Sequence, residues 1–190
     1  MRVLNKDEFK LEKEKLFEDI KEGAMFIYPT DTVYGIGCDA TNFKAVKKIR
    51  ETKERYIRPF SVIAPSKEWI RENCIVDKKA EQWIEKLPGP YTLILKLKDK
   101  DVIAPNVNSD MDTLGVRIPK HWFTQELKKL DIPIVTTSAN IIGEAFMTSM
   151  DDLNRTIKEK VDFIIYEGEL KAKPSQIIDL TKEEAEIIKR

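Results

Sequence analysis

The segment Tyr28-Pro29-Thr30-Asp31-Thr32-Val33-Tyr34-Gly35-Ile36-Gly37 decides how the rest of this chain is organised. A short apolar run, residues 24–28, leads into a proline, which cannot donate a hydrogen bond to a β-ladder. Three small polar residues follow, and two glycines separated by one residue close the segment. This pattern predicts a tight turn between two strands. Polar groups held there often bind ligands, but an ordinary hairpin whose Thr and Asp side chains bond to their own backbone would give the same pattern.

The composition indicates one globular domain. The chain has 190 residues, of which 42% are hydrophobic, enough for one buried core and short for two. Its 33 basic and 33 acidic residues cancel, so attraction to nucleic acid is not a property of the whole molecule. No apolar run approaches the length of a membrane span, and residues 1–6 lack the apolar core of a signal peptide. Cys38 and Cys74 show no metal-binding spacing, so we expect a reducing, cytoplasmic location, no membrane contact and no zinc.

Predicted helices and strands alternate along the chain. Helices are expected at residues 7–22, 66–70, 77–87 and 122–130. Another should begin at Thr41 or Asn42, with Phe43, Val46 and Ile49 facing inward. A last helix should run from Thr148 or Ser149 to about residue 159. Strands are expected at residues 24–28, 60–64, 91–97, 113–118, 134–137, 163–166, 176–180 and 186–189, with a polar loop at 98–112. We predict an α+β (mixed α/β) fold, a single domain with a twisted mixed β-sheet covered by helices.

The segment from Lys44 to Arg58 is strongly basic. It carries seven basic residues against two acidic ones, a local net charge of +5. Lys53 and Arg55 lie at the end of the predicted helix, and an ammonium beside a guanidinium can bind a polyphosphate. A charged run of this kind also commonly does no more than face solvent.

Polar residues in or after apolar strands are further candidates. Ser138 and Asn140 could hold phosphate oxygens, a ribose or a metal-bound water, or could simply stabilise their own loop. Arg117 lies within the apolar run Leu114–Ile118, so it should meet either an internal carboxylate or an anionic ligand. The sole histidine, His121, has no partner for a metal site, and the sequence has no Walker-type or GxGxxG loop. These residues indicate an anion-binding α/β protein.

Six motifs, in order, resemble the YrdC-like domain of the threonylcarbamoyl-AMP synthase family. They cover nearly the whole chain and are residues 28–37, Lys53-Glu-Arg55, Pro88-Gly-Pro90-Tyr-Thr92, Val116-Arg-Ile-Pro119, Pro133-Ile-Val-Thr-Thr-Ser-Ala-Asn140 and Pro174-Ser175. The resemblance implies a single YrdC-like domain over residues 1–190, with its core at about 7–190 and no additional C-terminal domain. It also implies an L-threonylcarbamoyladenylate synthase, a nucleotidyltransferase that joins L-threonine, bicarbonate and ATP and releases pyrophosphate. Mg²⁺ would be carried by the ATP, and a separate tRNA threonylcarbamoyltransferase would use the product.

The resemblance also assigns roles to residues of this chain. The implied catalytic set is Lys53, Arg55, Ser138 and Asn140. The implied ATP-binding set is Arg55, Arg58, Thr113, Ser138, Asn140 and Lys189. The implied threonine-binding set is Thr32, Arg117, Thr136 and Ser175, with Arg117 on the carboxylate. No protein metal site is implied.

Several positions depart from the family pattern. Tyr56 replaces the proline that usually follows the Lys-x-Arg motif, which leaves the match of Arg58 open. Ile63 stands where some relatives have a histidine that contacts threonine, and Gln176 replaces a threonine near the end of the domain. Lys189 replaces an arginine, which keeps the charge but loses the planar fork.

Two other functions fit the residues. The basic segment could belong to an RNA-binding module that acts without catalysis, although the neutral net charge and the few aromatic residues in the segment count against it. The chain could also be a carbamoyl- or acyl-adenylating enzyme that takes a different amine. In an enzyme, the length and polarity of residues 98–112 make them our choice for the loop that closes over the nucleotide.

Overall fold

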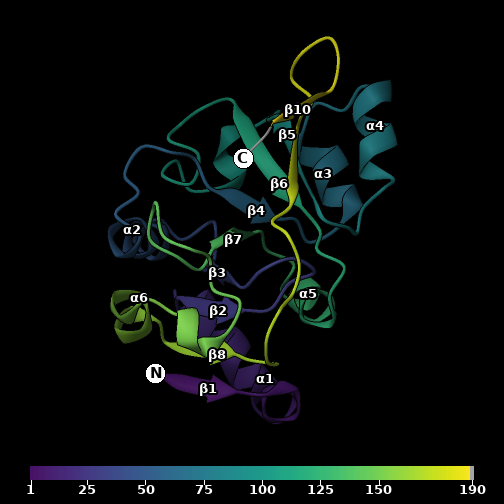
Figure 1. Cartoon of the computed structure of the whole chain (residues 1–190). Helices are drawn as coiled ribbons and strands as arrows, with labels where there is room; N and C mark the ends of the chain where they lie inside the picture. Colours follow the sequence, from purple (N-terminus) through teal and green to yellow (C-terminus); the bar gives the residue numbers. More distant parts are fainter. Residues whose placement is uncertain (189–190) are drawn as a thin grey trace.

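The computed structural model describes residues 1–188, whose ten strands form one sheet. The strands are β1 (Arg2–Leu4), β2 (Phe26–Tyr28), β3 (Gly35–Gly37), β4 (Ser61–Ile63), β5 (Tyr91–Lys96), β6 (Thr113–Arg117), β7 (Ile134–Ser138), β8 (Phe163–Ile165), β9 (Gln176–Asp179) and β10 (Glu186–Ile188). Their order across the sheet is β1-β8-β2-β3-β7-β4-β6-β5-β9-β10, so β1 and β10 are its two edges (Figure 1). β2 pairs parallel to β8 and antiparallel to β3, which confirms the predicted mixed sheet.

Six α-helices of the described chain cover this sheet on both faces. They are α1 (Lys6–Lys21), α2 (Phe43–Thr52), α3 (Lys67–Asn73), α4 (Lys78–Ile84), α5 (Trp122–Leu127) and α6 (Arg155–Lys160). Short 3₁₀ helices lie at Lys100–Val102, Lys128–Leu130 and Met150–Asp152. Over residues 1–188, none of the helices combines the length and the apolar character that crossing a membrane requires.

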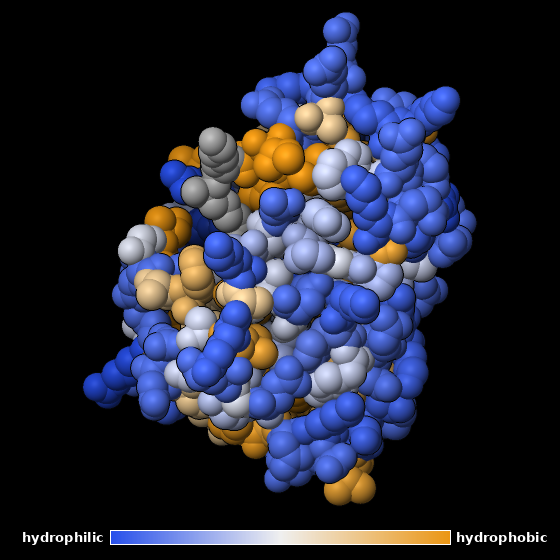
Figure 2. Space-filling view, turned by 45° about the vertical axis from the view of Figure 1, so that its right-hand side comes forward, coloured by the Kyte–Doolittle hydropathy of each residue, from blue (hydrophilic) through white to orange (hydrophobic). Residues whose placement is uncertain are grey.

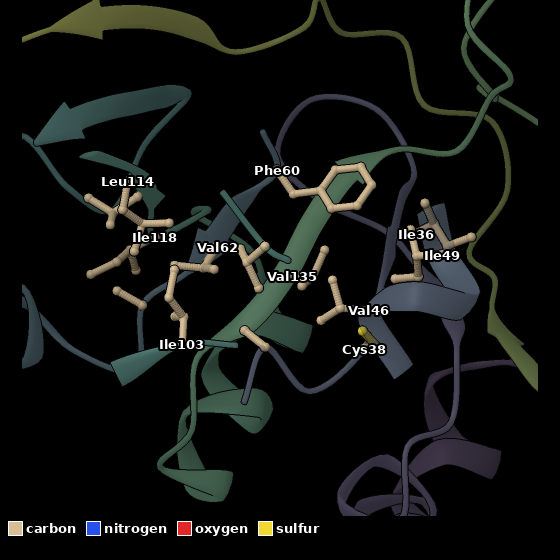
Figure 3. Close-up of a cluster of buried hydrophobic side chains, with 14 of the residues drawn as sticks. Ile36, Cys38, Val46, Ile49, Phe60, Val62, Ile103, Leu114, Ile118 and Val135 are labelled. Atoms are coloured by element: carbon tan, nitrogen blue, oxygen red, sulfur yellow. The ribbon is translucent and has the colours of Figure 1, made fainter. Parts of the chain in front are cut away.

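The two faces of the sheet carry separate hydrophobic cores, because successive side chains of a strand point to opposite sides. In β7, Val135 belongs to the first core, under α2, α3, α4 and α6, which Figure 3 shows in part. Its neighbour Ile134 belongs to the second core, under α1 and α5. The second core is rich in aromatic rings, and Phe123 lies within 5.6 Å of the ring centroids of Phe9 and Tyr28. On the face shown in Figure 2, hydrophilic side chains surround a paler central area, with scattered hydrophobic patches.

The predicted turn at residues 28–37 is a hairpin between β2 and β3. Tyr28 lies opposite Gly35 in the antiparallel register. The hydroxyl of Thr30 donates to the carbonyl of Val33 at 2.7 Å and accepts the backbone N–H of Thr32 at 3.0 Å. Thr30 therefore stabilises its own turn, as the alternative interpretation expected, and the Thr32 hydroxyl takes part in the same turn, 2.9 Å from the Thr30 hydroxyl.

Three features differ from the sequence-based prediction. The sheet begins earlier than the expected core at about residue 7, because Arg2–Leu4 pairs parallel to β8. The inward orientation predicted for Phe43 is wrong. This first residue of α2 is 51% exposed, since the helix begins there and its buried face starts at Ala45. The helix predicted from Thr148 or Ser149 to residue 159 is broken, because Asp152 closes a local turn on those two residues and Asn154 caps a new helix.

The segment at residues 98–112 is a loop, as predicted, but it is anchored in the core. It contains the turn Lys100–Val102, and Ile103, Ala104 and Val107 are buried in the first hydrophobic core. The amide of Asn108 donates to the carbonyls of Met111 and Thr113 at 2.8 and 2.9 Å. Only its last residues approach the cavity described below, since Met111 is among the cavity's lining residues.

Replacing Phe123 with alanine should lower the free energy of unfolding by about 3–5 kcal/mol, because it removes a ring that packs on four other rings of the second core. Equilibrium denaturation measures this loss. Leu11→Ala is the control, since Leu11 is 87% exposed on α1 and its replacement should change stability by no more than about 0.5 kcal/mol. Similar losses for the two variants would contradict the core assignment.

Candidate active site

A cavity of about 680 Å³ lies on the sheet face that also carries the aromatic core. Its floor is a row of small residues directly opposite one another on three strands, Thr136 of β7, Ser61 of β4 and Gly115 of β6. A Cβ atom on Gly115 would collide with the Ser61 hydroxyl. Further along the same face, under α1 and α5, large aromatic side chains fill the corresponding space. The cavity exists because the central strands carry small side chains on this face.

A smaller chamber of about 40 Å³ adjoins the cavity. The two spaces share the residues Ser61, Thr92, Thr136, Thr137 and Ser138. A ligand in the chamber would therefore touch the same wall as a ligand in the large cavity. The two spaces are therefore neighbours on this face of the sheet.

Most of the predicted residues line one or both of the two spaces, and Thr136 and Ser138 line both. The four residues predicted to bind threonine all line the small chamber, and they are Thr32, Arg117, Thr136 and Ser175. Five residues predicted to bind ATP line the large cavity, and they are Arg55, Arg58, Thr113, Ser138 and Asn140. The sixth, Lys189, lies outside the described residues. Ile63, at the position of the histidine of some relatives, is buried in the aromatic core and lines neither space.

Arg117 has an internal carboxylate partner and also an unused donor. Its Nη2 atom lies 2.8 Å from Oδ1 of Asp31 and 3.4 Å from the hydroxyl of Thr32. Burial lowers the pKa of Arg117, and the Asp31 carboxylate opposes this shift. Among residues 1–188, Nε of Arg117 finds no hydrogen-bond partner. A buried donor without an acceptor is costly, so an acceptor oxygen bound in the chamber would satisfy this group.

Lys53 lines neither space and instead holds the turn that carries Ser138 and Asn140. Its Nζ donates to the carbonyl of Ser138 at 2.6 Å and to that of Asn140. Ser138 in turn donates its hydroxyl to Oδ1 of Asn140 at 2.5 Å. Burial, with a smaller contribution from the nearby Arg55, lowers the pKa of Lys53 to about 7. The loop stabilises itself, as one sequence interpretation expected, and both residues also line the cavity, so their binding of a ligand stays a prediction.

Arg50 supports the site from behind, and the sequence analysis did not single it out. Its guanidinium donates to the carbonyls of Arg55 and Arg58 at 2.7 and 3.2 Å, and to that of Val107 at 3.1 Å. It also lies over the ring of Phe60, 4.6 Å from the centroid. Arg50 thus ties the loop that carries the two cavity arginines to the loop at residues 106–109. Its position was a signal, because residues 46, 49, 50 and 53 follow the i, i+3, i+4, i+7 spacing of one helix face.

Metal ligands do not gather on this site. Across the described part of the chain, no group of three or more His, Cys, Asp or Glu residues could hold a metal ion. The cavity lining does include the carboxylate of Glu144. A magnesium ion would accordingly have to take most of its ligands from substrate oxygens and water, which is common for this ion.

Comparison with known proteins identifies the family. Residues 18–190 match the Sua5/YciO/YrdC family model, which carries the description "Telomere recombination". The chain is 38% identical, over 182 residues, to a protein of Methanocaldococcus jannaschii named putative threonylcarbamoyl-AMP synthase, covering 93% of this chain and 84% of that one. The chain belongs to the Sua5/YciO/YrdC family. The resemblance inferred from the motifs is therefore confirmed.

Solved structures of the Sua5/YciO/YrdC family share the fold. The chain is 30% identical to P. abyssi Sua5, in the H234A/Y235A form (TM-score 0.88) and in a crystal structure complexed with L-threonine (TM-score 0.85). In both cases the similarity covers 98% of this chain and 56% of the other, so the chain spans about half the length of those proteins.

The stability of the protein should depend on pH through Lys53. Because the pKa of this lysine is about 7 when folded and 10.5 in a model peptide, the unfolded chain binds the extra proton between these values. The contribution of Lys53 to the free energy of unfolding should therefore rise by up to about 1.4 kcal/mol per pH unit from pH 7 to 9. Denaturation of the wild type and of Lys53→Met at several pH values measures it.

The free energy of unfolding of the wild type should rise with pH relative to that of Lys53→Met. The matched control is Lys44→Met, since Lys44 is exposed on the same helix and its loss should leave the pH dependence unchanged. Parallel curves for the wild type and Lys53→Met would show that Lys53 keeps its charge throughout this range.

Proposed function

We propose that this protein is an L-threonylcarbamoyladenylate synthase, a nucleotidyltransferase that makes L-threonylcarbamoyl-AMP and pyrophosphate from L-threonine, bicarbonate and ATP. The observation that carries the proposal is that two adjoining spaces share a wall, a small one lined by hydroxyl groups and a guanidinium, and a large one with room for a nucleotide. The name of the M. jannaschii relative and the L-threonine complex of P. abyssi Sua5 support the same substrate class.

The small chamber suits an amino acid with a polar side chain. Hydroxyl groups from Thr32, Thr136 and Ser175 line it together with the guanidinium of Arg117. Its apolar lining is slight, so the chamber favours a ligand that can make hydrogen bonds over one with an aliphatic side chain. The free Nε of Arg117 is the donor that we assign to the carboxylate of threonine.

The large cavity suits a nucleoside triphosphate. Arg55 and Arg58 provide positive charge, Ser138 on the shared wall provides a hydroxyl, and Asn140 of the large cavity provides an amide. Apolar side chains of Ile94, Phe146 and Ile177 line the same space, which suits the flat faces of a base. The phosphates would lie toward the arginines and the shared wall, where the threonine chamber begins.

The proposed reaction has two steps that need no protein nucleophile. The threonine amine attacks the carbon of bicarbonate, and loss of water gives a carbamate. A carbamate oxygen then attacks the α-phosphorus of ATP, the bond to the β-phosphate oxygen breaks, and pyrophosphate leaves. The residues of the chain bind the two anions side by side and offset their charge, which is a large part of catalysis for such a transfer. Mg²⁺ carried by the ATP would neutralise further phosphate charge.

The product would pass to a separate tRNA threonylcarbamoyltransferase, and we place this reaction in the cytoplasm, where threonine, ATP and tRNA occur together. An RNA-binding module is a weaker explanation of the basic segment. Arg50 and Lys53 are buried against backbone carbonyls, and Lys48 pairs with Asp162 at 2.8 Å. The segment is therefore not one exposed basic surface, and its charge serves the fold and the cavity.

Pyrophosphate release from ATP and Mg²⁺ tests the function, and it should require both L-threonine and bicarbonate. Arg55→Ala and Lys53→Ala should lower the rate by about 100-fold or more, because Arg55 is a cation that lines the large cavity and Lys53 holds the turn that carries Ser138. Lys44→Ala is the control within the basic segment and should keep full activity, since Lys44 is exposed and lines neither space.

Other outcomes of this assay identify the alternatives. Serine or glycine supporting release better than threonine would indicate a different amine substrate. Release without any amine would indicate a nucleotide hydrolase. No release from folded protein, together with RNA binding that weakens steeply with salt and is lost in Lys44→Ala, would support the RNA-binding module.

A further inference from the structure

The two glycines of the hairpin leave one face of β3 bare, and Tyr28 occupies that space. Tyr28 is in β2, beside β3, and its side chain lies across the strand. A Cβ atom built on Gly35 would lie 3.0 Å from Cζ of Tyr28, and one built on Gly37 would lie 3.0 Å from Cε1. A Cβ atom on Gly35 would therefore press on the Tyr28 ring and shift it by a few tenths of an ångström. Gly37 has a different main constraint, because a Cβ atom there would lie 2.5 Å from the backbone carbonyl oxygen of Val135.

The ring of Tyr28 reaches a residue two strands away. β3 pairs with β2 on one side and with β7 on the other. The hydroxyl of Tyr28 donates to Oγ1 of Thr136, in β7, at 2.7 Å. Thr136 belongs to the wall shared by the chamber and the cavity. The bare face of β3 thus connects the aromatic core directly to the candidate active site.

The surroundings of Tyr28 determine which hydroxyl is the donor. The ring is fully buried and packs on Phe26 and Phe123, with centroid distances of 5.3 and 5.6 Å. Burial raises the pKa of Tyr28 to about 12, so its hydroxyl keeps its proton at neutral pH. Within residues 1–188, Thr136 is the hydrogen-bond partner that the structure gives this hydroxyl. A buried O–H group needs an acceptor, and Oγ1 of Thr136 provides it.

This direction has a consequence for Thr136. A threonine hydroxyl has one hydrogen to donate and two lone pairs that accept. Because Oγ1 accepts the hydrogen of Tyr28, the hydrogen of the Thr136 hydroxyl must point away from Tyr28. It is therefore left for another acceptor. No acceptor for it is recorded among the described residues, and the side chain lines the chamber.

We propose that Tyr28 is a positioning residue that fixes the Thr136 hydroxyl as a hydrogen-bond donor into the small chamber, and that residue 35 is a glycine because the ring must cross β3. The inference rests on the proposed function, and it adds that the atom of the bound amino acid facing Thr136 is an acceptor oxygen. Arg117 then supplies one donor of the chamber and Thr136 a second.

Binding of L-threonine, measured by calorimetry, tests the proposal with Tyr28→Phe. This variant keeps the ring and loses only the hydroxyl, so the protein should stay folded. The dissociation constant for threonine should rise about 3- to 10-fold, which is typical for the loss of one hydrogen bond. The affinity for ATP should stay within about 2-fold of the wild type, because the residues of the large cavity other than the shared wall are untouched.

A double-mutant comparison separates positioning from a general effect on structure. In a Thr136→Val background the hydroxyl that Tyr28 acts on is absent, so adding Tyr28→Phe should weaken threonine binding no further. Gly35→Ala should reproduce the defect of Tyr28→Phe, because its methyl group displaces the ring. Equal threonine affinity of wild type and Tyr28→Phe, or the same loss in both backgrounds, would overturn the proposal. Failure of the wild type itself to bind threonine would instead contradict the proposed function.

Discussion

The structure depends on a contrast between the two faces of its central strands. One face of β7, β4 and β6 contributes Val135, Val62 and Val116 to the first hydrophobic core. The opposite face of the same strands carries the small residues that floor the cavity. A sheet can keep such an open face only if its other face and its two ends are well packed. The aromatic core under α1 and α5 supplies that packing at one end, and Tyr28 marks where the packed region meets the open one.

Buried cations are the second feature that shapes the site. Arg50 and Lys53 lie inside the protein and bond to backbone carbonyl oxygens rather than to carboxylates. Burying charge costs free energy unless hydrogen bonds compensate, and here each cation joins two segments that line the cavity. The position of Arg55 and Ser138 therefore depends on two residues that lie behind the cavity wall and line neither space themselves.

Much of the site could be predicted from the sequence because its motifs are local. The hairpin at residues 28–37, the strand that carries Arg117 and the turn at residues 138–140 were each predicted at their observed positions. Arg50 was not, because a charged residue on an otherwise apolar helix face is ambiguous until its partners are known. Those partners are carbonyls of residues 55, 58 and 107, which only the folded chain brings to it. The short strand β1 was missed for a similar reason, since three residues have little pattern and its partner β8 lies at the other end of the chain.

The sequence by itself determined the alternation of helices and strands, the hairpin and the kinds of side chain available for binding anions. These follow from short-range rules, because turn residues, helix caps and apolar periodicity act over a few neighbouring residues. The tertiary structure alone decided that the residues predicted to bind ligands line two adjoining spaces and that Tyr28 reaches Thr136 across β3. Strand order and register bring together residues that are about a hundred positions apart in the chain, and no local pattern encodes those neighbours.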